Sequence, residues 1–182
     1  MKIAIGVGLL TLFALPLTAL GQQTPAVGQN LARADFVGSQ GQSLGSAALV
    51  GTPTGVLIQI RMQNVPEGQH GFHIHGTGKC DGPDFQSAGG HFNPTGAKHG
   101  FMPTGGAHAG DMPNVIVQSD GILNADIVLT GVTLWQGANS LLKEGGTALV
   151  MHAGPDDYAT DPAGNSGGRI ACAVIQRQAA AR

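Results

Sequence analysis

The apolar segments of this chain are short, and glycine-rich turns separate them. No segment repeats apolar residues every 3.6 positions for long enough to predict an extended amphipathic helix, although a short helix fits residues 140–144. The 30 glycines show no period of three, which excludes a collagen-like chain. We therefore predict an all-β domain of about eight short strands in an antiparallel sandwich or barrel.

The predicted strands are rich in aliphatic residues and are bounded by Gly, Pro, Asn or Asp. They cover residues 31–37, 42–50, 56–63, 71–76, 114–118, 122–129, 147–153 and 169–176. Two neighbouring pairs should form hairpins. One is 42–50 with 56–63, and the other is 114–118 with 122–129. Between the strands lie two long polar segments, 77–113 and 154–168, and loops of such length in a small domain are usually functional.

Residues 1–21 have the features of a secretory signal peptide. Lys2 precedes an apolar run over 3–20, and small residues before Gln22 predict cleavage there. The run is also just long enough for a membrane anchor, but no basic cluster follows it. We expect an exported protein, periplasmic or secreted, without a stable membrane anchor and with residues 22–30 as a flexible lead-in.

Charge and cysteine content narrow the function classes further. The net charge of -2 gives no electrostatic reason to expect nucleic acid as a partner. Cys80 and Cys172 are the only cysteines. In an exported protein two cysteines usually pair, and two buried free thiols are the alternative.

Histidines gather at the ends of predicted strands and in the long loops. His73 and His75 alternate with Phe72 and Ile74, so both lie on one face of a strand. Asp111 follows His108 by three residues. Imidazole and carboxylate groups are suitable ligands for zinc or copper. Spacing alone predicts a metal site and does not give the number of metals.

Seven motifs follow one another in a specific order. They are GFHIHG at 71–76, GGHFNP at 89–94, KHG at 98–100, HAGDMPN at 108–114, MHA at 151–153, DDY at 156–158 and GNSGGRIAC at 164–172. Over residues 31–176 the chain thereby resembles the copper/zinc superoxide dismutases, specifically their bacterial exported branch. The resemblance implies an eight-stranded antiparallel Greek-key β-sandwich or barrel with two long functional loops. It also implies a domain over 31–182 with one copper and one zinc ion per chain.

The resemblance assigns roles to individual residues. Copper would be held by His73, His75, His91 and His152. Zinc would be held by His91, His99, His108 and Asp111, so that His91 bridges the two metals. The carboxylate of Asp156 would link His73 to His99 behind the metals. Cys80 and Cys172 would form a disulfide between the metal-binding loop and the last strand.

The implied activity is the conversion of two superoxide anions and two protons to oxygen and hydrogen peroxide, by alternating reduction and reoxidation of copper. Two residues would be catalytic. His91 would take up a proton when it leaves copper, and Arg169 would position the anion at the copper mouth. Two alternatives remain, a metal carrier of the same fold and a zinc-only structural protein. The complete set of ligands and Arg169 argue against both.

Some features depart from the animal enzymes of this family. Residues 153–168 contain three aspartates but no lysine that could steer superoxide. Lys79, Lys98 and Lys143 could supply steering or be ordinary surface charges. Cys80 lies only five residues after His75, which matches the bacterial pattern and puts the animal-type dimer interface in doubt. We expect a monomer or a homodimer. Trp135 fits either an interface or an exposed loop, and we expect a structural role for His70.

Overall fold

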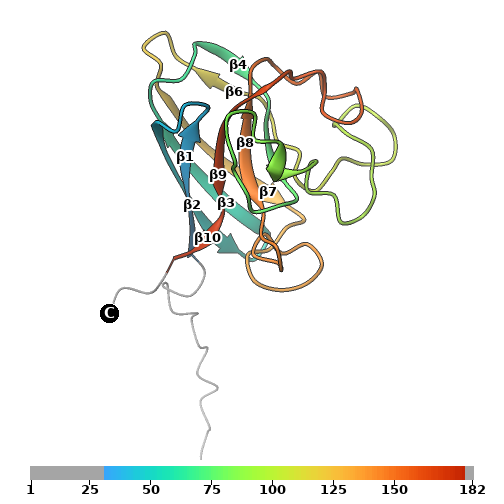
Figure 1. Cartoon of the computed structure of the whole chain (residues 1–182). Coiled ribbons are helices and arrows are strands. Elements are labelled where there is room, and N and C mark those ends of the chain that lie inside the picture. The colour runs from blue at the N-terminus through green and yellow to red at the C-terminus, as the bar shows by residue number, and fades with distance from the viewer. Residues whose placement is uncertain (1–30, 179–182) are drawn as a thin grey trace, which may run out of the picture.

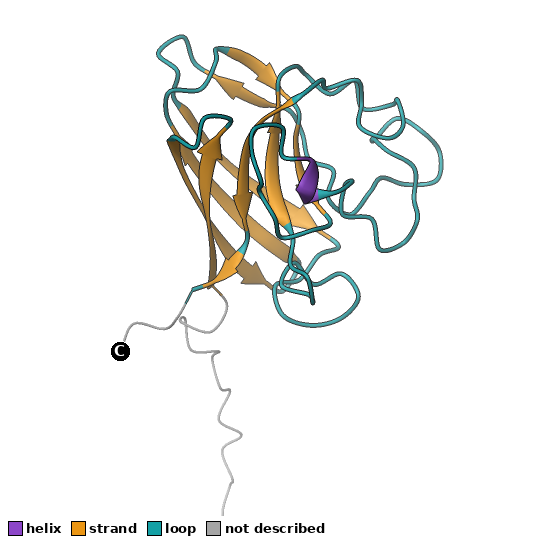
Figure 2. Ribbon diagram, in the orientation of Figure 1, coloured by secondary structure: helices purple, strands orange, loops and turns teal. Residues whose placement is uncertain are grey.

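The computed structural model describes residues 31–178 and shows a curled β-sheet with long loops gathered on one side (Figure 1). The expected signal peptide and lead-in lie outside these residues. The strands are β1 Leu31–Gly38, β2 Ser43–Thr52, β3 Gly55–Met62, β4 Gly68–His70, β5 Phe72–His75, β6 Val115–Val117, β7 Leu123–Thr130, β8 Ala148–His152, β9 Arg169–Val174 and β10 Gln176–Arg177. One short 3-10 helix, η1, spans Gln86–Ala88 (Figure 2).

Eight of the strands form one antiparallel sheet. Its order is β5-β8-β9-β1-β2-β3-β7, with β10 paired to β1, while β4 and β6 form a separate pair. Since β3 neighbours β7 and β5 neighbours β8, the chain crosses between distant parts of the sheet, as in a Greek key. This arrangement confirms the predicted all-β antiparallel class.

The first expected hairpin is confirmed, and the second is wrong. Strands β2 and β3 pair over their full length. Strand β6 instead pairs with β4, and β7 pairs with β3, although a tight turn at 118–122 does connect them. The chain changes sheet at this turn, and both strands bury apolar side chains in the main core.

The short helix expected at 140–144 does not form. The backbone N–H groups of Leu141 and Leu142 donate to the carbonyls of Thr133 and Leu134, across the loop. The Ser140 hydroxyl donates to the Leu134 carbonyl as well. These contacts within the loop replace the hydrogen bonds that a helix would make.

Strand β5, at one edge of the sheet, has one face in the apolar core and the other face lined by histidines. Strand β5 is buried on both faces. Phe72 and Ile74 belong to the main apolar core, whereas His73 and His75 lie on the opposite face. Strand β8 pairs with β5 and ends in His152, so three histidines are fixed on rigid neighbouring strands.

Among the described residues, no helix has the length and apolar character needed to span a bilayer.

Candidate metal centre

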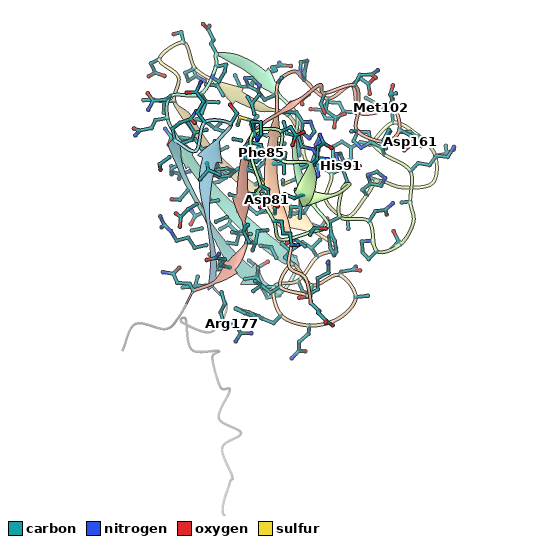
Figure 3. The ribbon with its side chains drawn as sticks, viewed as in Figure 1. Asp81, Phe85, His91, Met102, Asp161 and Arg177 are labelled. Atoms are coloured by element: carbon teal, nitrogen blue, oxygen red, sulfur yellow. A yellow bond between two sulfur atoms is a disulfide. The ribbon has the colours of Figure 1, made fainter. Side chains whose placement is uncertain are left out.

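Two loops cover the histidines of β5 and β8. The first joins β5 to β6 and carries η1, and the second joins β8 to β9. Both gather on the same side of the sheet (Figure 2), and His91 lies where they meet it (Figure 3). Residues more than fifty positions apart in sequence are therefore brought into one site.

The four predicted copper ligands lie together. Donor atoms of His73, His75, His91 and His152 are all within 4.8 Å of one another. The strand register explains this arrangement, because β5 pairs with β8 and an isolated bridge joins His75 to His91. A register shift between Met151 and His152 lies at the point where the last of these histidines enters the site.

In His75 and His152, a hydrogen bond from one ring nitrogen leaves the other ring nitrogen facing the site. Nδ1 of His75 lies 2.8 Å from the Gly89 carbonyl, and Nδ1 of His152 lies 3.1 Å from the Gly167 carbonyl. A carbonyl only accepts, so both Nδ1 atoms donate and both neutral rings have a lone pair at Nε2. Those two Nε2 atoms are 3.4 Å apart. Two facing lone pairs are repulsive unless a cation lies between them.

The four predicted zinc ligands form an adjoining group. Their donor atoms also lie within 4.8 Å of one another. The Nδ1 atoms of His91, His99 and His108 surround Oδ1 of Asp111 at 2.8, 3.2 and 3.3 Å. Oδ2 of Asp111 accepts hydrogen bonds from the backbone N–H groups of Gly100 and His108. Three imidazoles with one carboxylate suit a closed tetrahedral zinc site.

The carboxylate of Asp156 connects the two ligand groups by hydrogen bonds to one histidine of each. Its Oδ2 accepts from Nε2 of His73 at 2.6 Å, and its Oδ1 accepts from Nε2 of His99 at 3.0 Å. These bonds place the N–H of each ring at Nε2. They also direct Nδ1 of His73 into the four-histidine group and Nδ1 of His99 towards Asp111.

Two orphaned atoms test whether the residues fit metals. Nδ1 of His73 and Nε2 of His91 are buried and have no hydrogen-bond partner. Buried polar atoms normally have partners. Both belong to the four-histidine group, and His91 turns its other nitrogen, Nδ1, towards the zinc group. The residues therefore fit one metal in each group with His91 shared between them.

Burial keeps the imidazoles neutral and hydrogen bonds keep the carboxylates charged. Burial lowers the pKa of His75 to about 2 and those of His91 and His152 to about 4. Burial also opposes ionisation of Asp111, but hydrogen bonds from His91 and the Gly100 N–H outweigh it and lower the pKa to about 2. Neutral imidazoles with an ionised carboxylate are the state that binds metal.

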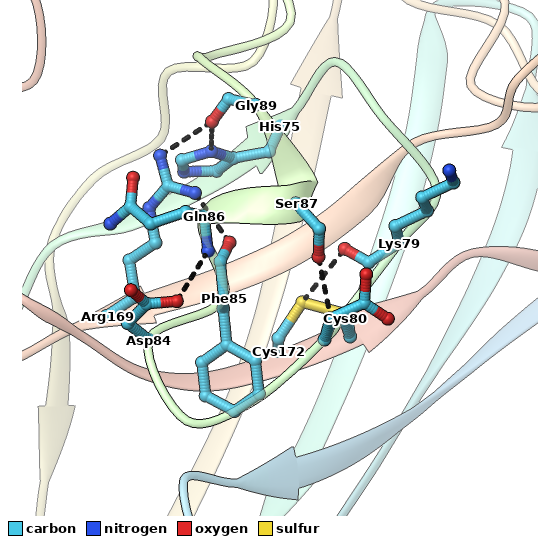
Figure 4. The surroundings of a disulfide bond; sticks show 11 residues. His75, Lys79, Cys80, Asp84, Phe85, Gln86, Ser87, Gly89, Arg169 and Cys172 are labelled. Atoms are coloured by element: carbon cyan, nitrogen blue, oxygen red, sulfur yellow. Dashed lines mark hydrogen bonds between the residues drawn. A yellow bond between two sulfur atoms is a disulfide. The ribbon is translucent and has the colours of Figure 1, made fainter.

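Arg169 is held by the loop that the disulfide fastens (Figure 4). Its guanidinium donates to the carbonyls of Phe85 and Gly89, both at 2.6 Å. The Gly89 carbonyl also accepts from His75, so one backbone group links this cation to the four-histidine group. Cys80 and Cys172 form the predicted disulfide, and no cysteine is free.

His70 and Trp135, which the sequence left without a site role, are both packed against neighbouring residues. His70 is buried between the carbonyls of His152 and Pro66, and it therefore anchors the site without joining either ligand group. Trp135 packs on the core and stacks under the Arg177 guanidinium at 4.0 Å.

Sequence reasoning assigned no role to three residues that contact the site. Asp161 accepts from the His99 backbone N–H, Asn114 holds the backbone of Asp156, and Gly164 lies against the Asp156 carboxylate. Their contacts involve backbone groups or close approach, which residue types at a given spacing do not reveal.

Comparison with known proteins agrees with this geometry. The family model of copper/zinc superoxide dismutase matches residues 44–175. The chain is 52% identical over 145 residues to superoxide dismutase [Cu-Zn] 1 of Aquifex aeolicus strain VF5, covering 79% of this chain and 86% of that one. It is 50% identical over 147 residues to superoxide dismutase [Cu-Zn] 2 of the same organism, covering 80% and 86%.

A solved structure shares the fold as well. The crystal structure of a double mutant of a SOD-like protein from Bacillus subtilis superposes with a TM-score of 0.77 at 39% identity, covering 79% of this chain and 96% of that one. The family match spans most of the described residues and includes every residue of both ligand groups. The chain therefore belongs to the copper/zinc superoxide dismutase family.

Proposed function

We propose that His73, His75, His91 and His152 hold copper in this dismutase, and that His91, His99, His108 and Asp111 hold zinc. The enzyme is an oxidoreductase that converts superoxide to oxygen and hydrogen peroxide. The observation that supports the residue assignment best is the pair of orphaned buried atoms, Nδ1 of His73 and Nε2 of His91. When bound, copper supplies one-electron redox chemistry and zinc supplies a fixed positive charge beside His91.

Arg169 binds and orients the substrate. Two backbone carbonyls hold part of its guanidinium, and its remaining N–H groups are free to donate to a small anion. A guanidinium cannot lose its proton in the working pH range, so it serves as a permanent positive charge.

His91 carries the proton. Its Nε2 is one of the two orphaned atoms in the four-histidine group, and its Nδ1 faces the zinc group. We assign Nε2 as the atom that takes up a proton after the first superoxide leaves as oxygen. The same atom returns that proton to the second superoxide, and water supplies the other proton of hydrogen peroxide.

We further propose that the protein is exported to the periplasm or secreted. The disulfide supports an oxidising compartment, and the N-terminal apolar run supports a cleaved leader. We expect the mature protein to begin at Gln22, which mass spectrometry of the secreted or periplasmic fraction would measure. A mature chain that retains residues 1–21 would contradict this proposal.

Superoxide consumption by the metal-loaded mature protein tests the assignment, with the variant His152→Ala beside it. We expect rapid decay by the wild-type protein and loss of at least about a hundredfold in the variant, since one of four copper ligands is gone. Gln69→Ala is the control, because Gln69 is an exposed residue of β4 outside both ligand groups. It should retain two metals per chain and most of the activity. Stoichiometric metal binding without catalytic decay by the wild type would indicate a metal carrier instead.

A further inference from the structure

We propose that Asn114 is a positioning residue for both metal groups, because its side chain holds the backbone of Asp156. Nδ2 of Asn114 donates to the Asp156 carbonyl at 2.9 Å, and its Oδ1 accepts from the Asp156 N–H at 2.8 Å. Both polar atoms of one amide are used on a single residue. This inference rests on the role proposed above for Asp156.

The two bonds hold the backbone of the residue whose carboxylate links the two ligand groups. Its carboxylate reaches Nε2 of both His73 and His99, so a rotation or shift of its backbone moves the partner of one ring in each ligand group. Such partners fix the orientation of metal-binding imidazoles. Asn114 therefore acts on both ligand groups through the backbone of one residue, Asp156, and its side chain makes no hydrogen bond to either group.

Two further hydrogen bonds join Asn114 and Asp156 through Tyr158. The Asn114 backbone N–H donates to the Tyr158 hydroxyl at 2.8 Å, and the Tyr158 backbone N–H donates to Oδ1 of Asp156 at 2.6 Å. We call these contacts, together with the two amide bonds, the Asn114 clamp. Tyr158 has a positive φ of 61°, an unusual value for a non-glycine residue that the clamp helps to hold.

The clamp joins the two loops that form the metal centre. Asn114 lies three residues after Asp111 and directly before β6, whose Val115 is buried and pairs with His70 of β4. Asp156 and Tyr158 belong to the second loop. The clamp therefore ties the second loop to the end of the first at a point supported by a strand.

Asn93 provides a matched control within the same chain. Its Nδ2 donates to the Ala97 carbonyl and its Oδ1 accepts from the Ala97 N–H, at 2.8 and 3.0 Å. The bonding is the same in kind, and Asn93 is also half-buried, but it makes no hydrogen bond to Asp156. A purely structural effect of losing such an amide should be common to both sites.

The experiment compares Asn114→Ala with Asn93→Ala in the full metal-loaded protein, reduced so that it is diamagnetic. Proton NMR measures the imidazole N–H protons at Nε2 of His73 and His99. Exchange of these two protons with solvent should be about tenfold faster in Asn114→Ala, because two hydrogen bonds that hold their carboxylate partner are lost. The N–H at Nδ1 of His75, which donates to Gly89, should be unchanged. Asn93→Ala should leave all three protons as in the wild type.

Zinc competition with a chelator gives a second measurement. Asn114→Ala should bind zinc up to about tenfold more weakly, the lower end of the effect of groups that hydrogen-bond metal ligands. Equal zinc affinity and equal exchange in the two alanine variants would overturn the proposal. Should Asn114→Ala fail to fold, Asn114→Asp keeps the size of the side chain but removes the donor to the Asp156 carbonyl, and unchanged His73 and His99 protons in that variant would overturn the proposal as well.

The outcomes separate this inference from the function on which it rests. If the wild-type protein itself lacks the two protected N–H protons, Asp156 does not hold His73 and His99, and the proposed site fails. If the wild type has them and Asn114→Ala leaves them unchanged, only the role of Asn114 fails.

Discussion

At the scale of single residues, the site depends on hydrogen-bonded side chains and also on Gly164, which has no side chain. A Cβ atom at Gly164 would lie 1.8 Å from Oδ1 of Asp156 and 2.7 Å from Nε2 of His99. Its φ of +63° is also unfavourable for residues with a side chain. Gly164 thus allows the second loop to close directly over the carboxylate that links the two ligand groups.

Gly164→Ala should therefore displace Asp156 from His99. We expect zinc affinity to fall by about 10- to 100-fold, as when a partner of a metal ligand is removed. Isothermal titration with zinc would measure this change. Gly96→Ala is the control, because that glycine has a similar φ of +67° and nothing within 4 Å of its Cβ position. Equal zinc affinities in the two variants would show that backbone strain, not the close approach, limits position 164.

At the scale of elements, the disulfide joins the loop after β5 to β9. Cys172 is fully buried in β9, and Cys80 lies 92 residues away in sequence. The same loop supplies the Phe85 and Gly89 carbonyls that hold Arg169, and the Phe85 ring packs with Cys172 in a small apolar cluster. The disulfide and this cluster hold the segment that positions the cation.

The double variant Cys80→Ser with Cys172→Ser should lower the free energy of unfolding by about 2–5 kcal/mol, because the unfolded chain loses a long-range constraint. Urea unfolding of the variant and the wild-type protein measures the difference. We also expect a higher KM for superoxide, since the carbonyls that hold Arg169 become less fixed. An unchanged KM at reduced stability would mean that the Phe85 cluster alone positions this loop.

At the scale of the whole molecule, metal binding and folding are coupled through buried imidazoles. In the metal-free protein His91 and His152 have pKa values lowered to about 4, and His75 to about 2. In the unfolded chain these rings return to the ordinary value of about 6.5. Below that pH the unfolded chain binds more protons than the folded one, so acid favours unfolding.

The metal-free protein should therefore lose stability as the pH falls from 6.5 towards 4. A histidine with a pKa lowered to about 4 costs up to about 2 kcal/mol at pH 5. The low pKa of Asp111 adds a further loss only below about pH 4, where its carboxylate would be protonated in the unfolded chain. Urea unfolding of the chelator-treated protein from pH 7.5 to 4.5 measures the slope. A constant free energy of unfolding from pH 7 to 5 would contradict this expectation.

The sequence by itself determined most of the strand pattern, with β4 and β10 missed, as well as the class of fold and the residue types of both ligand groups. Short alternating segments such as 56–63 leave few options besides an antiparallel sheet, and the order of the histidine motifs is specific to one family. The hairpin of β2 and β3 was predictable because a five-residue Gly-Thr-Pro-Thr-Gly turn connects strands of matched pattern.

Only the tertiary structure decided the rest. The partners of β6 and β7 depend on which apolar faces meet in the core, and a local turn signal at 119–121 contains no such information. The contacts of Asn114, Gly164 and the Gly89 carbonyl form between loops that are distant in sequence, mostly through backbone groups. Every residue has the same backbone groups, so residue type cannot reveal which of them hold the site, and the folded path of the chain determines it.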